Sequence, residues 1–143
     1  MKVNIKKLNP NAKVPTYAKH GDAGMDLTAV TCYRDEYDNY VYGTGLALEI
    51  PEGYVGLVFP RSSNRKTSAY MTNHVGVIDS GYRGEVMVTF KSRDFITRDS
   101  APYSIGDRIG QIIIIPYPHI EFTEVAKLSE TERGEGGHGS TGK

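Results

Sequence analysis

The sequence has one cysteine, no tryptophan, no excess of charge of either sign and no long hydrophobic run. The single Cys32 excludes an internal disulfide and suits a reducing environment, so we expect a cytoplasmic protein, or one in the host cytoplasm if the source is viral. Seventeen basic residues balance 17 acidic ones, which argues against a nucleic-acid or membrane-surface partner, because either would favour a basic patch. The apolar run 112–115 is far too short to cross a bilayer, and residues 1–5 give no sign of a signal peptide.

Glycine and tyrosine are plentiful, and no stretch keeps a helical period. The 143 residues include 16 glycines, seven prolines and ten tyrosines, with short apolar runs between turn residues, which is typical of a single all-β domain. We predict a jelly-roll-like β-sandwich or barrel with about ten short strands and at most one short helix, at residues 63–70. The clearest strands are expected at residues 3–8, 25–31, 44–50, 54–59, 75–78, 86–90, 109–115 and 122–126, with a hairpin tip at 35–39.

Residues 73–90 carry the most informative pattern. Two β-prone runs flank the turn-forming sequence Asp-Ser-Gly-Tyr at residues 79–82, which predicts a β-hairpin. Such a hairpin would present backbone donors and acceptors to a planar heterocycle, with the Asn73 amide beside them and the Asp79 carboxylate where the first strand ends. An ordinary hairpin with Asp79 as a turn former explains the same residues.

Two further features suit a phosphate ligand. Arg61, Ser62 and Ser63 follow a strand and precede the possible helix, where a guanidinium, hydroxyls and free N–H groups form a phosphate cradle. A helix N-cap beside a surface arginine is the alternative. Gln111 interrupts an apolar strand, and a buried amide must either satisfy backbone groups or contact a ligand.

Residues 129–143 contain no hydrophobic side chain, and half of residues 133–142 are glycine. This composition cannot build a core of its own, so a disordered terminus is one interpretation. The other is a flexible arm that orders over a bound nucleotide, with Arg133, Ser140 and Thr141 clamping its phosphates.

Five stretches resemble, in the right order, the signature motifs of the homotrimeric dUTP pyrophosphatases (dUTPases): AGMDL at 23–27, PRSS at 60–63, NHVGVIDSGYRG at 73–84, GDRIGQ at 106–111 and RGEGGHGSTG at 133–142. Each motif is weak alone, but five in order across nearly the whole chain are specific. The resemblance implies a jelly-roll β domain at residues 1–128 and a flexible arm at 129–143 that closes over the active site of a neighbouring subunit. It also implies Mg²⁺-dependent hydrolysis of dUTP to dUMP and pyrophosphate, which keeps uracil out of DNA and supplies dUMP for dTMP synthesis.

The resemblance also implies roles for individual residues. Asp79 would orient and deprotonate the attacking water, and Arg61, Gln111 and Arg133 would neutralise charge on the leaving group. Asp26 would reach Mg²⁺ through water, with the ion otherwise held by the substrate phosphates. The substrate contacts carried over in this way are Ser62, Ser63, Asn73, Val77, Ile78, Tyr82, Met87, His138, Gly139, Ser140 and Thr141.

The chain departs from the family pattern at the lid over the base. His138 stands where the family usually has a Phe that stacks on uracil, so Phe95, in the polar loop after the expected hairpin, is a second candidate for the base lid. Met25 replaces a frequent Tyr and is expected to be a packing variant. Asp107 and Arg108 are expected to form a structural ion pair, with a contact between subunits as one option.

Other functions are compatible with parts of the pattern. A related dCTP deaminase needs a Glu near the base, for which Glu85 is the available residue, and the glycine-rich arm fits hydrolysis better. A dUTP-binding regulatory protein would use ligand-driven ordering of the arm to gate contact with a protein partner. A jelly-roll structural or lectin-like module would have no reason to carry all five motifs.

Overall fold

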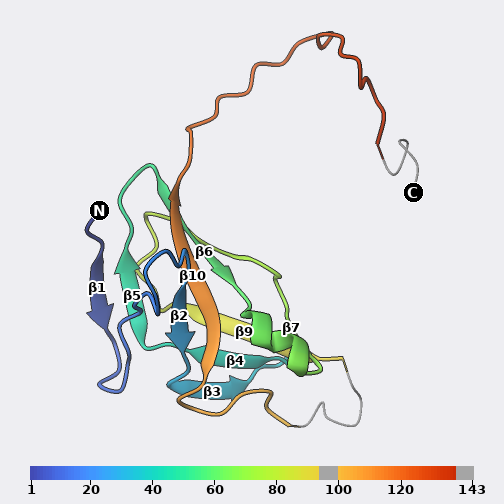
Figure 1. Cartoon of the computed structure of the whole chain (residues 1–143). Helices are drawn as coiled ribbons and strands as arrows, with labels where there is room; N and C mark the ends of the chain where they lie inside the picture. The colour runs from blue at the N-terminus through green and yellow to red at the C-terminus, as the bar shows by residue number, and fades with distance from the viewer. Residues whose placement is uncertain (94–99, 138–143) are drawn as a thin grey trace.

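Ten short β-strands and one 3-10 helix make up the computed structural model, which describes residues 1–93 and 100–137 (Figure 1). The strands are β1 (Asn4–Lys7), β2 (Met25–Thr28), β3 (Thr31–Arg34), β4 (Tyr40–Gly43), β5 (Leu46–Glu49), β6 (Tyr54–Phe59), β7 (Ala69–Met71), β8 (Gly76–Ile78), β9 (Met87–Ser92) and β10 (Arg108–Pro116), and the helix is η1 (Ser62–Lys66). The prediction of an all-β fold with at most one short helix is confirmed.

The strands form three antiparallel sheets. Two have four strands, in the orders β2-β10-β6-β8 and β3-β4-β9-β7, and the third pairs β1 with β5. Buried side chains from both larger sheets belong to one hydrophobic cluster, in which Leu27, Val58 and Ile112 come from the first sheet and Tyr42 and Phe90 from the second. The two sheets therefore share one core, as in the jelly-roll-like sandwich that the sequence predicts.

The stretch predicted as one strand at residues 25–31 is divided between β2 and β3. The chain crosses from one sheet to the other at Ala29 and Val30. Ala29 N donates to Asp107 O at 2.9 Å beside β10, whereas Val30 N donates to Gly43 O at 2.8 Å at the end of β4. Residues 25–31 form one uninterrupted β-prone run without Gly or Pro, which is why they are predicted as a single strand.

The predicted hairpin of residues 75–78 and 86–90 is wrong as a pairing. β8 pairs with β6, and β9 pairs with β4 and β7, so that no strand register of the described chain joins β8 to β9. Val86 explains the separation, because its N–H donates to Leu46 O at 2.8 Å and its carbonyl accepts from Thr44 Oγ1 at 2.7 Å. These bonds draw the chain toward β5 before β9 begins.

The helix predicted at residues 63–70 is shorter and tighter than expected. It ends at Lys66, where Thr67 N donates to Asn64 O at 2.9 Å and Thr67 Oγ1 donates to the same carbonyl at 2.9 Å. These bonds close the last turn at a spacing of three residues. The chain then enters β7.

The strand predicted at residues 122–126 is absent. After β10 the chain leaves the body as an extended segment (Figure 1), and the bond from Tyr117 N to Gly53 O, 3.0 Å long, is the last backbone contact with the body that the described residues show. Phe122 is 96% exposed. A strand needs a partner, and residues 122–126 have none among the described residues. The domain boundary at residue 128 stays a prediction. No helix within the described ranges is long and apolar enough to span a membrane.

Candidate active site

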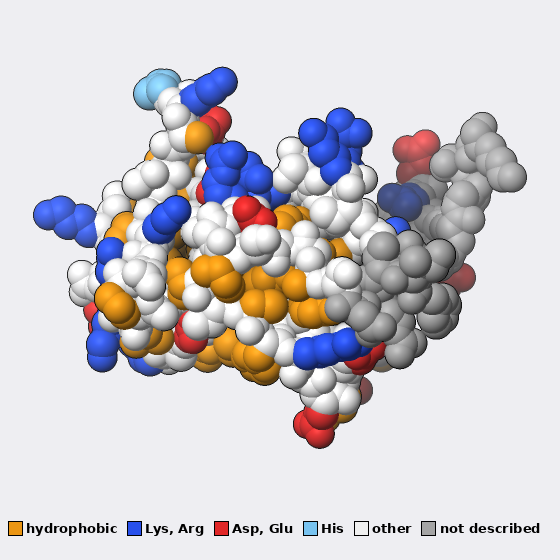
Figure 2. Space-filling model, turned by 90° about the horizontal axis from the view of Figure 1, so that it is seen from below, with side chains coloured by type: hydrophobic (Ala, Val, Ile, Leu, Met, Phe, Trp, Pro, Cys, Tyr) orange, Lys and Arg blue, Asp and Glu red, His pale blue; other side chains and the backbone are white. Residues whose placement is uncertain are grey.

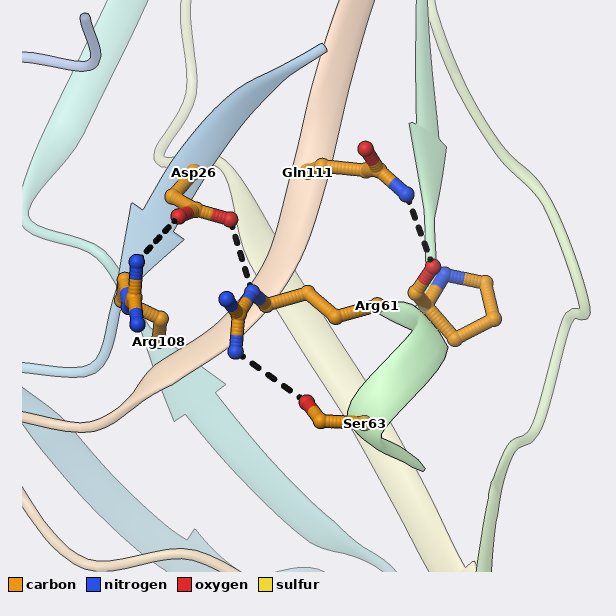
Figure 3. A network of polar contacts seen from close by, with 6 residues as sticks. Asp26, Arg61, Ser63, Arg108 and Gln111 are labelled. Carbon is orange, nitrogen blue, oxygen red and sulfur yellow. Dashed lines mark hydrogen bonds and ion pairs between the residues drawn. The ribbon is translucent and has the colours of Figure 1, made fainter. Parts of the chain in front are cut away.

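Asp26 lies at the centre of a polar network between β2, β10 and η1 (Figure 3). Its Oδ1 accepts from Arg61 Nε at 2.7 Å, and its Oδ2 accepts from Arg108 Nη1 at 3.0 Å. Arg61 Nη1 also donates to Ser63 Oγ at 3.1 Å. Because two guanidinium groups face one carboxylate, the network carries a net positive charge and suits an anionic ligand.

The register of β10 explains why residues distant in sequence meet here. β10 pairs with β2 on one side and with β6 on the other, so that Gln111 lies opposite both Asp26 and Phe59. Pro60 and Arg61 follow directly after β6, and Gln111 Nε2 donates to Pro60 O at 3.1 Å. One central strand thus joins the residues of three motifs.

These residues line a hollow of about 390 Å³, which we call the Asp26 pocket; its walls are formed by Thr16, Ala18, Asp22, Ala23, Gly24, Asp26, Arg61, Arg108, Gln111 and Ile113. No group of three or more His, Cys, Asp or Glu in the described ranges could cage a metal ion. Mg²⁺ is usually held by one or two carboxylates together with water and substrate phosphates. The Asp26 carboxylate in this pocket therefore fits an ion that arrives with a phosphorylated ligand.

A second hollow of about 300 Å³, the Asp79 pocket, lies between the end of β8 and the start of β9 and is lined by Val77, Ile78, Asp79, Tyr82, Glu85, Met87 and Thr89. Asp79 opens a turn in which Tyr82 N donates to Asp79 O at 3.1 Å. Tyr82 Oη donates to Glu85 O at 2.9 Å, and its ring lies so close to Gly84 that a Cβ would not fit there. The volume is at the lower end of the range for small-molecule sites.

Asn73 lies outside the lining of the Asp79 pocket. It is exposed in the turn before β8, and its carbonyl accepts from Val75 N at 2.6 Å. The structure thus brings Val77, Tyr82 and Met87 together with Asp79, and the contact of the Asn73 amide with a base stays a prediction.

The two pockets lie at opposite edges of one sheet. In the order β2-β10-β6-β8, Asp26 is on the first strand and Asp79 directly follows the last. Neighbouring strands are about 4.8 Å apart, so three steps separate β2 from β8 by roughly 14 Å. Arg61 follows β6, which pairs with β8, but it lies beyond the Val58–Gly76 end of that pairing, whereas Asp79 lies beyond the Gly56–Ile78 end. One chain therefore does not bring Asp79 together with Asp26 and Arg61.

Arg133 belongs to the segment that follows β10, and this segment leaves the body of the molecule (Figure 1). It is exposed, and its Nε donates to Gly136 O at 2.9 Å, within the same segment. It is thus not joined to either pocket. Phe95, His138, Gly139, Ser140 and Thr141 lie outside the described residues.

Two polar residues have partners that the sequence did not indicate. Arg108 pairs with Asp26, and Asp107 Oδ2 accepts from Ser104 N at 2.8 Å, so the described residues do not show the ion pair predicted between Asp107 and Arg108. Glu85 lines the Asp79 pocket, and its Oε1 accepts from Gly45 N at 2.6 Å. Arg108 lies in the GDRIGQ motif, which marks it as a site residue without revealing its partner. No local pattern marks Glu85.

Comparison with known proteins agrees with this geometry. The dUTPase family model matches residues 10–142. The deoxyuridine 5′-triphosphate nucleotidohydrolase of Nocardia farcinica is 40% identical over 142 residues, covering 98% of this chain and 85% of the relative. The enzyme of the same name from Dictyoglomus turgidum is 35% identical, and the match covers 99% of each chain.

Two solved structures have the same fold. A mutant dUTPase of Staphylococcus bacteriophage 80alpha, solved with dUpNHpp, is 28% identical with a TM-score of 0.83, and 99% of each chain is covered. A mutant dUTPase of phage phi11 of S. aureus, described with a structural Mg(II) ion, is 25% identical with a TM-score of 0.74 and covers 89% of this chain. From the motifs, the fold and these matches along almost its whole length, the chain belongs to the dUTPase family.

Proposed function

We propose that this chain is a dUTP nucleotidohydrolase that converts dUTP and water to dUMP and pyrophosphate. The observation that carries the proposal is the pairing of β10 with both β2 and β6, which assembles Asp26, Arg61 and Gln111 in one pocket. The activity would remove dUTP before uracil enters DNA and supply dUMP for dTMP synthesis. We place it in the cytoplasm, where the exposed Cys32 would stay reduced.

The Asp79 pocket would hold the deoxyuridine. β8 is an edge strand, so the outer backbone groups around Val77 are available to the donor and acceptor edge of uracil, with the Asn73 amide beside them. Cytosine would leave those groups mismatched, and a site built for one hydrogen-bonding edge rejects the other by about 10⁴-fold. Ile78 and Met87 would enclose the nucleoside, and the Tyr82 ring would exclude a 2′-hydroxyl.

Asp79 would act on the attacking water. Its carboxylate would orient the water and accept a proton while the oxygen bonds to the α-phosphorus and the bond to the bridging oxygen breaks. Pyrophosphate leaves with the bonding electrons, and Arg61, Gln111 and Arg133 would donate to its oxygens. Mg²⁺, when bound through Asp26 and water, supplies further positive charge to the triphosphate.

The complete site would be shared in a homotrimer. The separation of the Asp79 pocket from the Asp26 pocket within one chain supports this, because a neighbouring copy would supply the missing half. Hydrophobic side chains form a band across one face of the molecule (Figure 2). Separately, the described chain exposes large apolar side chains such as Val77 and Ile105, which are 61% and 57% exposed. Such surfaces are typical of subunit contacts.

The arm, residues 129–143, would close over the site of a neighbouring subunit. Support comes from the extended path after Tyr117 and from the exposed apolar side chains along it, among them Phe122 and Leu128, which are 96% and 81% exposed. Arg133 and residues 138–141, including His138, Gly139, Ser140 and Thr141, would then contact the phosphates and the base. Phe95 stays the second candidate for the base lid.

A substrate panel tests the proposal. Purified protein with Mg²⁺ is given dUTP, dCTP, dTTP or UTP, and the nucleotide products, pyrophosphate and ammonia are measured. We expect dUMP and pyrophosphate from dUTP alone. Ammonia from dCTP would assign the chain to deaminase chemistry instead, a result that the bond from Gly45 N to the Glu85 carboxylate argues against.

A regulatory role through a protein partner would rest on the same ordering of the arm. One solved relative, a phage 80alpha dUTPase with dUPNHPP, is described as controlling transfer of virulence genes by a G protein-like mechanism. For this chain, tight dUTP binding without turnover in the substrate panel would favour the regulatory function over hydrolysis.

Gly24 provides a test of the Asp26 pocket. A Cβ on Gly24 would overlap Gln111 Oε1 and lie 3.2 Å from its Cδ. We expect Gly24→Ala to displace the Gln111 amide and lower kcat/KM for dUTP about tenfold, with little change in Tm, because the end of a flexible side chain can move. Steady-state kinetics and thermal unfolding measure the two effects.

The matched comparison for that prediction is the Gln111→Ala background. If Gly24→Ala acts through Gln111, it causes no additional loss of activity there. A full additional loss in the double variant would show that Gly24 acts by another route.

A further inference from the structure

We define the phosphate cradle as residues 61–63, at the start of η1. Tyr103 connects the hydrophobic core to this helix. Its hydroxyl donates to Asn64 Oδ1 at 2.7 Å. Its ring packs against Phe90 and Tyr42, with centroid distances of 5.1 and 6.1 Å. Phe90 and Tyr42 are fully buried, so Tyr103 rests on a rigid part of the core.

The backbone of Tyr103 is fixed as firmly as its ring. Its N–H donates to Tyr42 Oη at 3.0 Å, and its carbonyl accepts from the same hydroxyl at 2.9 Å. Burial raises the pKa of the Tyr103 phenol, so its hydroxyl stays protonated and remains a donor at neutral pH. The position of this donor is therefore set by the core and not by η1.

Asn64 lies in η1 and accepts a hydrogen bond from this fixed donor, so the bond orients η1 relative to the core. Besides accepting from Tyr103, its side chain donates to Ala69 O at 3.0 Å, at the start of β7. Its backbone N–H donates to Arg61 O at 2.9 Å. Asn64 thus connects Tyr103 on one side with the backbone of the phosphate cradle on the other.

The cradle is held on its opposite side by the Asp26 pocket. Asp26 accepts from Arg61 Nε, and Gln111 donates to Pro60 O, as described above. On binding a triphosphate, Arg61 would have to redirect donors from Asp26 and Ser63 toward the ligand. The bond between Tyr103 and Asn64 does not involve those donors, so it can persist while the side chains of the cradle rearrange.

We propose that the hydrogen bond from Tyr103 to Asn64 positions the phosphate cradle for the β- and γ-phosphates of the substrate. Tyr103 and Asn64 are positioning residues that act through Arg61, Ser62 and Ser63 and do not touch the substrate. This inference rests on the proposed function. The hydrogen bond would affect binding of the β- and γ-phosphates only, because binding of the nucleoside and the α-phosphate would depend on the Asp79 pocket.

Tyr103→Phe tests the proposal, because it removes the hydroxyl and keeps the ring against Phe90 and Tyr42. Isothermal titration calorimetry with Mg²⁺ measures the Kd of dUpNHpp and of dUMP for each variant. We expect dUpNHpp to bind about fivefold more weakly to Tyr103→Phe, with the Kd of dUMP unchanged. A purely structural role would lower Tm without changing the ratio of these two Kd values.

Tyr33→Phe is the matched control, because Tyr33 is 55% exposed on β3, away from both pockets. An unchanged Kd ratio in Tyr103→Phe, relative to this control, would overturn the proposal. Asn64→Ser gives an independent test and should raise the same ratio, whether or not Tyr103→Phe folds. In the double variant, Tyr103→Phe should cause no further weakening beyond that of Asn64→Ser.

The wild-type protein separates this inference from the function on which it rests. If wild type binds dUpNHpp no better than dUMP and does not hydrolyse dUTP, the proposed function and the inference both fail. If wild type hydrolyses dUTP and the Kd ratio is unchanged in Tyr103→Phe, or in Asn64→Ser where Tyr103→Phe does not fold, the inference alone fails.

Discussion

Replacing Asp79 by Asn is expected to lower kcat for dUTP by about 10³-fold while leaving the Kd of dUpNHpp within a few-fold of wild type. The amide has nearly the same volume as the carboxylate and can still make hydrogen bonds. It cannot accept the proton of the attacking water, however, so ligand binding and chemistry are separated. Pre-steady-state kinetics and calorimetry measure the two quantities independently.

Asp38→Asn is the control for this substitution. Asp38 lies in the β3–β4 turn with φ of 69°, a backbone conformation that Asn adopts well, and it is remote from both pockets. We expect its activity to equal that of wild type. Full turnover in Asp79→Asn would remove Asp79 from the role of general base.

Deleting residues 133–143 is expected to lower kcat/KM for dUTP by about 10²-fold without unfolding the protein. The hydrogen bonds of Arg133, Gly134 and Gly136 in the described structure stay within residues 131–136, so the core loses no contact. The deletion removes Arg133 and the glycine-rich motif, which would otherwise close over the phosphates. Steady-state kinetics and thermal unfolding are measured on the same preparation.

The control lies on the same segment, before the point of truncation. Lys127→Ala breaks an ion pair with Glu130 whose side chains are 78% and 86% exposed, and such pairs contribute little. We expect wild-type kinetics from it. A truncated protein with an unaltered rate would return the arm to the role of a solvated terminus.

The all-β architecture could be predicted from the sequence because turn residues and alternation act locally. The strand predicted at residues 109–115 is confirmed as β10. The hairpin tip predicted at 35–39 is also confirmed, because it joins the paired strands β3 and β4. The pairing of strands could not be predicted in the same way. β8 and β9 belong to different sheets because Val86 bonds to Thr44 and Leu46, and contacts of this kind leave no local pattern.

Six of the ten residues that line the Asp26 pocket lie in the motifs, but the hydrogen bonds among them could not be predicted from the sequence. Arg61 and Gln111 were expected beside a phosphate. The structure adds that Arg61 bonds to Asp26 on β2 and that Gln111 bonds to the carbonyl of Pro60, directly after β6. Tyr103 carries no motif at all. Its contact with Asn64 depends on where the core places the ring, which only the folded chain reveals.

The segment after β10 was the clearest failure. Residues 122–126 are predicted as a strand from β-prone side chains such as Phe122 and Val125, yet Phe122 is almost fully exposed in a single chain. β-prone residues indicate that a segment can pair with another strand, and they do not reveal whether that strand is in the same chain. This segment is therefore consistent with the proposed docking on another copy.

The central claim is that Asp79 of one copy works with Arg61 of another, and a mixed-subunit experiment tests it most directly. Asp79→Asn and Arg61→Ala chains with different affinity tags are coexpressed, and oligomers carrying both tags are purified in two steps. In a cyclic trimer with shared sites, every mixed oligomer contains one site with both residues intact, so we predict about one third of wild-type dUTP turnover. Turnover no higher than that of the two inactive parents would contradict the shared site.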